Sequence, residues 1–186
     1  QLMNSAIAIA SLQILRKNGW NLPEISIQKG MAKTQWSGRI EWINWRNHRL
    51  LIDGAHNPAA AKVLRQYVDT LKPENPDNKS DQFIVNWVVG MLSTKDHQDI
   101  FEALLKKGDR LYIIPVPDHN SANPESLVQL GTKVCPELSH CQAYPDLITA
   151  LEKAIESPST VTILSGSLYL LGHFLSTDFL PKSGNT

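Results

Sequence analysis

The residues with the clearest chemical potential lie in the segment D-G-A-H-N-P, which runs from Asp53 to Pro58. An apolar run typical of a strand ends at Asp53, the chain turns through Gly54, and Pro58 suits the first turn of a helix. Asn57 is placed to cap that helix, and a helix N-terminus favours an anion. We therefore expect Asp53 and His56 to face a polar ligand beyond the strand. The structural alternative is a plain strand-to-helix turn.

Other polar residues are candidates for the same site, each with a structural alternative. Arg39 lies near a change in composition, where an arginine also serves as a surface ion-pair former. Asn4 could be an ordinary polar residue of its helix. Ser165 and Ser167 flank a glycine after a predicted strand, where they either contact a ligand or cap the last helix. Asp96 is interpreted as a helix cap.

Composition limits the classes of function. Lys plus Arg equals Asp plus Glu at 18 each, so the formal net charge is zero, which argues against a general nucleic-acid binder. No apolar run approaches the roughly 20 residues that span a bilayer. Cys135, His140 and Cys141 are too few and too irregularly spaced for a structural zinc site, so we expect no metal on them. Two cysteines in 186 residues favour a reducing compartment, and we expect the cytoplasm.

The periodicity of apolar residues predicts alternating helices and strands. Helices are expected at 2–17, 23–32, 58–71, 96–107, 124–134, 146–156 and 168–175, and strands at 39–45, 49–53, 83–89, 110–114, 141–144 and 161–164. The first two strands form a hairpin, and the later ones are apolar on both faces. This pattern predicts an α/β fold with a Rossmann-like, doubly wound and mostly parallel sheet that has one antiparallel strand. Ligands of such sheets bind beyond the carboxyl ends of the strands, at residues 53–58, 90–96, 115–123 and 165–167.

The start of the chain has a different character. A helical pattern is already running at residue 2, so we expect a piece of a longer protein. Its apolar face, which includes Ile7, Leu12 and Leu15, should be exposed or should pair with another copy. We expect a domain boundary near residue 37 and a loose tail at 181–186.

Five segments in order resemble folylpolyglutamate synthases and dihydrofolate synthases, which belong to the Mur ligase superfamily. The segments are Gln1-x-x-Asn4-Ser5-Ala6, Trp36-Ser37-Gly38-Arg39, Asp53-Gly54-Ala55-His56-Asn57-Pro58, Gly90-Met91-Leu92-Ser93-Thr94-Lys95-Asp96 and Ser165-Gly166-Ser167-Leu168-Tyr169. The resemblance implies that residues 1–37 are the last helices of a central ATPase domain with its linker. It also implies that residues 38–180 are a Mur ligase-like C-terminal domain.

The family uses ATP to join L-glutamate to folate or dihydropteroate through an acyl phosphate. The resemblance implies ATP contacts for Asn4, Arg39 and Asp53, with Arg39 holding phosphate and acting in catalysis. It places His56 near the phosphates or the incoming glutamate, as a catalytic or substrate-binding residue. It places Ser165 and Ser167 at the amino-acid substrate.

Two departures from the family pattern bear on function. The sequence has no G-x-x-x-x-G-K-[ST] motif, so the resemblance leaves the phosphate-binding loop, the Mg²⁺ ligands and much of the folate site to an N-terminal ATPase domain outside these residues. We therefore expect the chain alone to be inactive. The segment 119–122 (H-N-S-A) also lacks an arginine that many relatives have.

Two alternatives remain open from the sequence. The chain could be a different Mur-superfamily amide ligase, similar to cyanophycin synthetase. It could also be a stand-alone α/β binding or regulatory module without catalysis, which the absent phosphate-binding loop fits equally well.

Overall fold

The computed structural model describes residues 2–34, 36–71, 83–159 and 161–176. Outside these ranges lie the predicted tail at 181–186, Gln1 of the first family-like segment, and residues 72–82. The chain divides into two compact units between Ser37 and Gly38, which are described separately.

The N-terminal unit consists of two helices, α1 (Leu2–Lys17) and α2 (Glu24–Lys33). An ion pair of 2.8 Å joins Arg16 to Glu24. The second helix begins one residue later than predicted, because Pro23 is an extended N-cap with ψ 140°. The predicted exposure of apolar side chains is confirmed at Ile7 and Leu15. No helix in the described part of the chain is long and apolar enough to cross a membrane.

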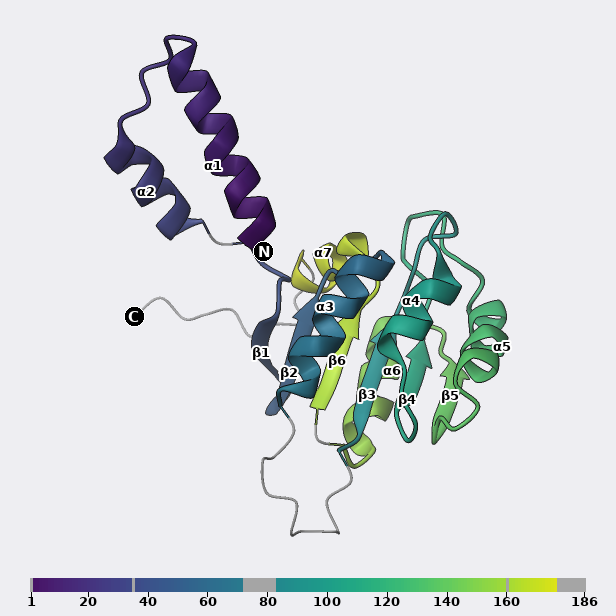
Figure 1. Cartoon of the computed structure of the whole chain (residues 1–186). Coiled ribbons are helices and arrows are strands. Elements are labelled where there is room, and N and C mark those ends of the chain that lie inside the picture. The colour runs from purple at the N-terminus through teal and green to yellow at the C-terminus, as the bar shows by residue number, and fades with distance from the viewer. Residues whose placement is uncertain (1, 35, 72–82, 160, 177–186) are drawn as a thin grey trace. The chain divides into compact units, whose positions relative to one another are not determined.

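The C-terminal unit is built on a six-stranded sheet in the order β1-β2-β6-β3-β4-β5. Its strands are β1 (Glu41–Trp45), β2 (His48–Asp53), β3 (Val85–Val89), β4 (Arg110–Ile113), β5 (His140–Ala143) and β6 (Val161–Ser165). All neighbouring strands are parallel except β1, which pairs with β2 in an antiparallel hairpin. The predicted fold class is therefore confirmed (Figure 1).

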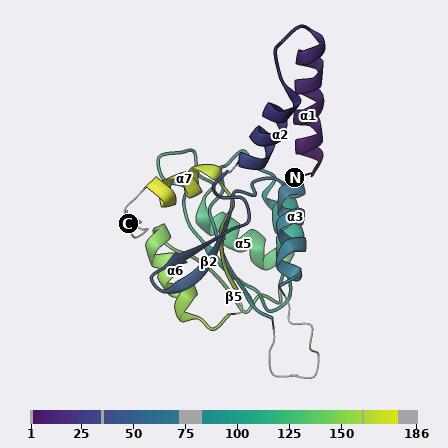
Figure 2. The same cartoon turned by 90° about the vertical axis from the view of Figure 1, so that its left-hand side faces the viewer.

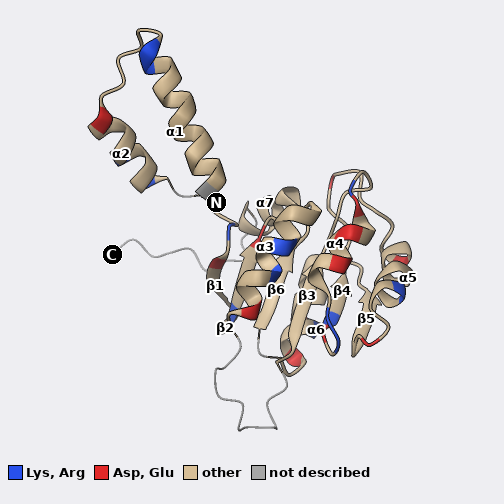
Figure 3. Ribbon diagram, in the orientation of Figure 1, with Lys and Arg blue, Asp and Glu red and all other residues tan. Residues whose placement is uncertain are grey.

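Helices cover both faces of the sheet and bury it. One face carries α3 (Pro58–Asp69), α4 (His97–Leu104) and α5 (Pro124–Val134), and the other carries α6 (Leu147–Glu156) and α7 (Leu168–Ser176), as Figure 2 shows. Successive side chains of β3 point to opposite faces of the sheet. Trp87 and Val89 pack against α3, α4 and α5, whereas Val88 packs against α6 and α7. Charged residues of both signs are scattered over the helices and loops (Figure 3).

Two element boundaries differ from the prediction for identifiable reasons. The first strand was expected from residue 39, but it begins at Glu41 because Ile40 has a left-handed backbone with φ 48°. Helix α4 was expected to reach Lys107 but ends at Leu104. There the Lys106 N–H turns to donate to the Asp109 carboxylate at 3.0 Å.

A buried ion pair fastens α3 to the amino end of β4. The Arg65 guanidinium donates to Asp109 at 2.7 Å and to the Leu104 carbonyl at 3.1 Å, and it also pairs with Asp69. Trp87 donates its indole N–H to the same Asp109 oxygen at 3.0 Å. Burial raises the pKa of Asp109 despite these donors. Asp69 is partly buried, which favours its neutral form, but hydrogen bonds from Lys106 and Arg65 lower its pKa to about 2.

We expect Arg65→Ala to lower the free energy of unfolding by about 3–5 kcal/mol, because it leaves the Asp109 carboxylate buried without its cation. Urea denaturation followed by tryptophan fluorescence would measure the change. Arg46→Ala is the matched control, since Arg46 pairs with Glu152 at the surface and should cost at most about 1 kcal/mol. Equal losses in the two variants would contradict this account of the ion pair.

Candidate functional site

The carboxyl ends of three adjacent strands meet at one edge of the sheet. In the strand register Asp53 of β2 pairs with Ser165 of β6, and Ser165 pairs with Val89 of β3. The helices that follow β3 and β6 lie on opposite faces of the sheet. Adjacent strands whose chains leave to opposite faces open a crevice, and this is where doubly wound sheets bind ligands.

Asp53 is a buried anchor at this edge. Its side chain is only 6% exposed, and its two oxygens accept the backbone N–H groups of Ile40 at 2.9 Å and Ala55 at 2.8 Å. Burial raises the pKa of Asp53, although those two hydrogen bonds and the charges of Arg39 and His56 act in the opposite direction. The carboxylate therefore first holds the backbone on either side of it, and only its remaining lone pairs are left for a ligand.

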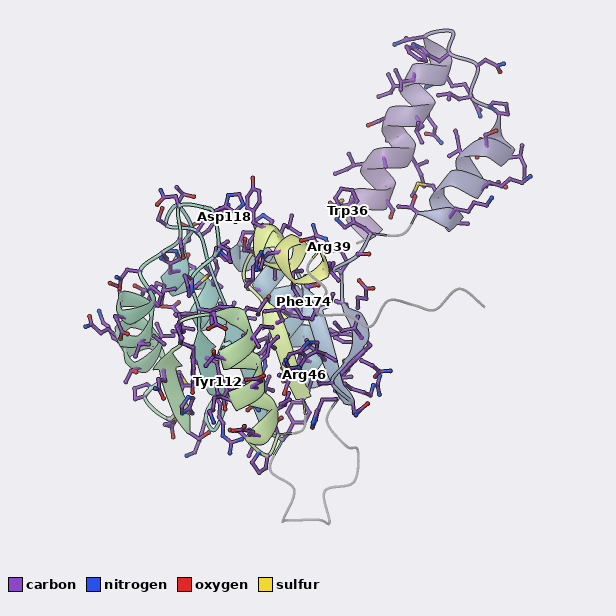
Figure 4. The ribbon with its side chains drawn as sticks, turned by 180° about the vertical axis from the view of Figure 1, so that it is seen from behind. Trp36, Arg39, Arg46, Tyr112, Asp118 and Phe174 are labelled. Atoms are coloured by element: carbon purple, nitrogen blue, oxygen red, sulfur yellow. The ribbon has the colours of Figure 1, made fainter. Side chains whose placement is uncertain are left out.

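Arg39 lies in a tightly held turn just before β1. Its neighbours Gly38 and Ile40 both have left-handed backbones, with φ 76° and 48°. The Gly38 N–H donates to the Glu41 carboxylate at 2.7 Å, and the Gly38 carbonyl accepts from Gly54 at 2.8 Å. Figure 4 shows Arg39 at the same end of the unit as Asp118, away from Arg46.

Arg39 is half-buried, and no residue in the described ranges forms a hydrogen bond or ion pair with its guanidinium. Its charge is near enough to act on Asp53. The alternative interpretation, a surface ion-pair former, therefore has no partner among those residues. An unpaired arginine at this edge is suited to bind a carboxylate or phosphate through two parallel hydrogen bonds.

His56 is oriented by its own turn. Its Nδ1 lies 2.8 Å from the Gly54 carbonyl. A carbonyl only accepts hydrogen bonds, so Nδ1 is the donor of this bond, and Nε2 has no hydrogen-bond partner among the described residues. The predicted cap is confirmed in the same segment, because the Asn57 side chain accepts the Ala60 N–H at 2.9 Å.

The two serines after β6 differ in their contacts. Ser167 accepts the Tyr169 N–H at 3.2 Å, which is the capping interaction considered as its structural alternative. Ser165 is fully buried, and its hydroxyl has no hydrogen-bond partner among the described residues. A buried hydroxyl without a partner is costly, so the free Oγ of Ser165 marks the site more strongly than Ser167 does.

Other predicted residues lie elsewhere. Asn4 is exposed on α1 of the N-terminal unit. Asp96 occupies the N-cap of α4, but no cap hydrogen bond from its side chain is present. Within the described ranges, no group of three or more His, Cys, Asp or Glu is arranged to hold a metal ion.

Sequence reasoning missed two contributors to the site. Glu41 was interpreted only as part of a strand, although a carboxylate two residues after Gly-Arg was the available signal. His119 stacks on Tyr169 with ring centroids 3.8 Å apart, which joins the loop after β4 to the start of α7. No signal in the sequence pairs these two rings.

Gly166 follows β6 and packs closely against the end of β3. Its φ is 104°, and an added Cβ would lie 2.6 Å from the Gly90 carbonyl oxygen. We expect Gly166→Ala to cost about 3 kcal/mol or more in the free energy of unfolding, because backbone strain and overpacking add. The matched control is Gly172→Ala on α7, where an added Cβ would meet no described atom within 4 Å apart from its own helix backbone and chain neighbours, and a helical alanine should stabilise by about 0.5–1 kcal/mol. A Gly166→Ala variant as stable as the parent in chemical denaturation would refute the close contact.

Comparison with known proteins gives relatives of one kind. The family described as "Dihydrofolate synthetase, C-terminal domain" matches residues 38–177. A probable dihydrofolate synthetase from Schizosaccharomyces pombe is 32% identical over 181 residues, which covers 92% of this chain and 41% of that protein. A folylpolyglutamate synthase from Lacticaseibacillus casei is 26% identical over 171 residues, which covers 91% of this chain and 36% of that protein. The chain thus spans about two fifths of these relatives or less.

Solved structures agree with the sequence matches. The folylpolyglutamate synthase of Thermotoga maritima is similar with a TM-score of 0.57 at 28% identity, covering 89% of this chain and 37% of that one. The bifunctional folylpolyglutamate synthase/dihydrofolate synthase of Yersinia pestis, complexed with AMPPNP and a manganese ion, gives a TM-score of 0.62 at 25% identity with the same coverage. The chain therefore belongs to the dihydrofolate synthetase C-terminal domain family, whose fold it carries from Gly38 onward.

Proposed function

We propose that this chain forms one wall of the active site of an ATP-dependent ligase that joins L-glutamate to folate or dihydropteroate. The observation that carries the proposal is the unpaired guanidinium of Arg39, which with His56 is near enough to act electrostatically on Asp53. These residues lie at the carboxyl edge of the sheet, in a chain whose relatives are named dihydrofolate and folylpolyglutamate synthases. The Yersinia pestis relative in complex with AMPPNP and manganese supports a nucleotide and a divalent cation as ligands.

In the proposed reaction the substrate carboxylate attacks the γ-phosphorus of ATP, ADP leaves, and the glutamate amine then displaces phosphate from the acyl phosphate. Arg39 holds phosphate oxygens and stabilises the charge of the transferred group. His56 lies near the phosphates or the incoming amine, where its free nitrogen can accept a proton. Asp53 accepts hydrogen bonds from the nucleotide through its remaining lone pairs, and Asn4 contacts ATP from the N-terminal unit.

The remaining assignments complete the site. Ser165 and Ser167 bind the amino-acid substrate, with the free hydroxyl of Ser165 as the stronger candidate. Because the 186 residues contain no G-x-x-x-x-G-K-[ST] motif, the proposal assigns the phosphate-binding loop, most Mg²⁺ ligands and much of the folate site to an ATPase domain outside them. The two free cysteines, Cys135 and Cys141, fit a cytoplasmic enzyme.

We expect MgATP, titrated into the ¹⁵N-labelled chain, to perturb the amide signals of Arg39, His56 and Gly166 and to leave those at the amino ends of the strands unchanged. Arg39→Ala should weaken binding by about tenfold, the loss expected for one or two charge-assisted hydrogen bonds exposed to solvent. Arg46→Ala is the matched control, because it removes the same charge at the other end of the sheet. Equal affinities in the two variants would remove Arg39 from the proposed site. Asp53→Ala is a poor probe, since it also leaves the backbone N–H groups of Ile40 and Ala55 without their acceptor.

We further expect the 186-residue chain to form no ligase product by itself. ATP, L-glutamate and dihydropteroate would be supplied together. A coupled assay would measure the release of ADP that depends on glutamate, and mass spectrometry would detect the amide product. Product formation by the chain alone would show that the phosphate-binding loop is dispensable, and would refute the division of labour proposed here.

A further inference from the structure

We propose that Glu41 is a positioning residue for Arg39, fixing it for an oligophosphate ligand. The inference rests on the proposed function, in which Arg39 binds phosphate. It goes beyond that function by naming a residue that acts on Arg39 through the backbone and has no direct contact with the ligand.

The backbone on both sides of Arg39 is held by hydrogen bonds. The two residues that flank Arg39 each donate their N–H group to a carboxylate, Gly38 to Glu41 at 2.7 Å and Ile40 to Asp53 at 2.9 Å. The Gly38 carbonyl is also held, by the Gly54 N–H at 2.8 Å. Glu41 itself is fixed in the sheet, where it pairs with Ile52 across the hairpin. The backbone of Arg39 is therefore tied on both sides to the ordered sheet.

These bonds hold the two neighbours of Arg39 in an uncommon backbone conformation. Ile40 is β-branched and has φ 48°, a conformation that costs of order 1–3 kcal/mol and persists only where the surroundings impose it. Gly38, at φ 76°, would regain more backbone freedom than any other residue if its N–H were released. Without Glu41, the segment that carries Arg39 can relax to other conformations, and the guanidinium loses its alignment.

Glu41 does not neutralise the charge of Arg39. Glu41 lies two residues from Arg39, yet the described part of the chain contains no ion pair between them. The Glu41 carboxylate is directed to the Gly38 N–H instead. Glu41 therefore orients the arginine without neutralising it, which leaves the positive charge available for an anion.

The sign of the mutational effect separates this role from simple electrostatics. A carboxylate near a phosphate site repels the ligand, so its removal should tighten binding if charge alone matters. Positioning predicts the opposite: Glu41→Ala should weaken MgATP binding to the chain by about fivefold, the scale of one lost charge-assisted hydrogen bond. Glu41→Gln retains a carbonyl acceptor for the Gly38 N–H, so it should bind at least as well as the parent chain.

The test is a double-mutant cycle of Glu41→Ala and Arg39→Ala, with MgATP affinity measured by NMR titration. If Glu41 acts through Arg39, Glu41→Ala should change the affinity less than about twofold in the Arg39→Ala background. Tighter binding by Glu41→Ala, an undiminished loss in the Arg39→Ala background, or a loss in Glu41→Gln as large as in Glu41→Ala would each overturn the inference.

Amide hydrogen exchange keeps the inference separate from the proposed function. Exchange at Gly38 should accelerate at least about tenfold in Glu41→Ala, because its N–H loses the carboxylate acceptor, whereas the Trp45 amide on the same strand should be unaffected. An unchanged exchange rate at Gly38 would refute the role of Glu41 in holding this backbone, whether or not MgATP binds. If the parent chain binds no MgATP while exchange at Gly38 responds as expected, the proposal that Arg39 binds phosphate fails. The inference that Glu41 holds the backbone beside Arg39 is then still supported.

Discussion

The arrangement of the site depends on one buried carboxylate, that of Asp53. Its two oxygens join three pieces of chain: the turn that carries Arg39, the end of β2, and the turn that leads into α3. A charged group removed from water is costly unless hydrogen bonds replace its hydration, and the backbone amides of Ile40 and Ala55 provide them. The same bonds fix the turn of His56, whose ring is held by the neighbouring Gly54 carbonyl. The turns at this edge of the sheet are thus held together by one carboxyl group of the protein itself.

Two arginines differ in a way that fits the roles proposed for them, stability for Arg65 and ligand binding for Arg39. Arg65 lies at the amino end of the strands and is fully paired with Asp109, Asp69 and a backbone carbonyl. Arg39 lies at the carboxyl end, where nearby carboxylates bind backbone N–H groups and leave its guanidinium unpaired. Filling its donors with protein acceptors would make Arg39 a second structural residue. In the proposed site, the free energy of ligand binding at Arg39 therefore depends on guanidinium N–H donors that have no acceptor among the described residues of the protein.

Much of this architecture could be predicted from residue patterns. The apolar runs in β3 and β6 indicated a sheet covered on both faces, and Asp53-Gly54 with Asn57-Pro58 located the strand end and the cap of α3. The predictions missed features that depend on contacts between distant residues. An alternating pattern at 39–45 could not show that Asp53 draws Ile40 out of the strand. Arg65, in the apolar stripe of α3, gave a hint of a buried partner, but its distance in sequence from Asp109 hid the pair.

The hydrogen bonds that hold the backbone around Arg39 also restrict where the chain can tolerate insertions and deletions. Three of the four residues from Gly38 to Glu41 have a fixed partner: Gly38 is hydrogen-bonded to Gly54, Ile40 to Asp53, and Glu41 pairs with Ile52 across the hairpin. An insertion or deletion inside this tetrapeptide would shift Arg39 relative to the sheet or flip the following strand to its other face. One residue earlier, at Ser37, the exposed chain has no such register to keep. Among homologous chains, length variation should therefore accumulate before Gly38 and stop there.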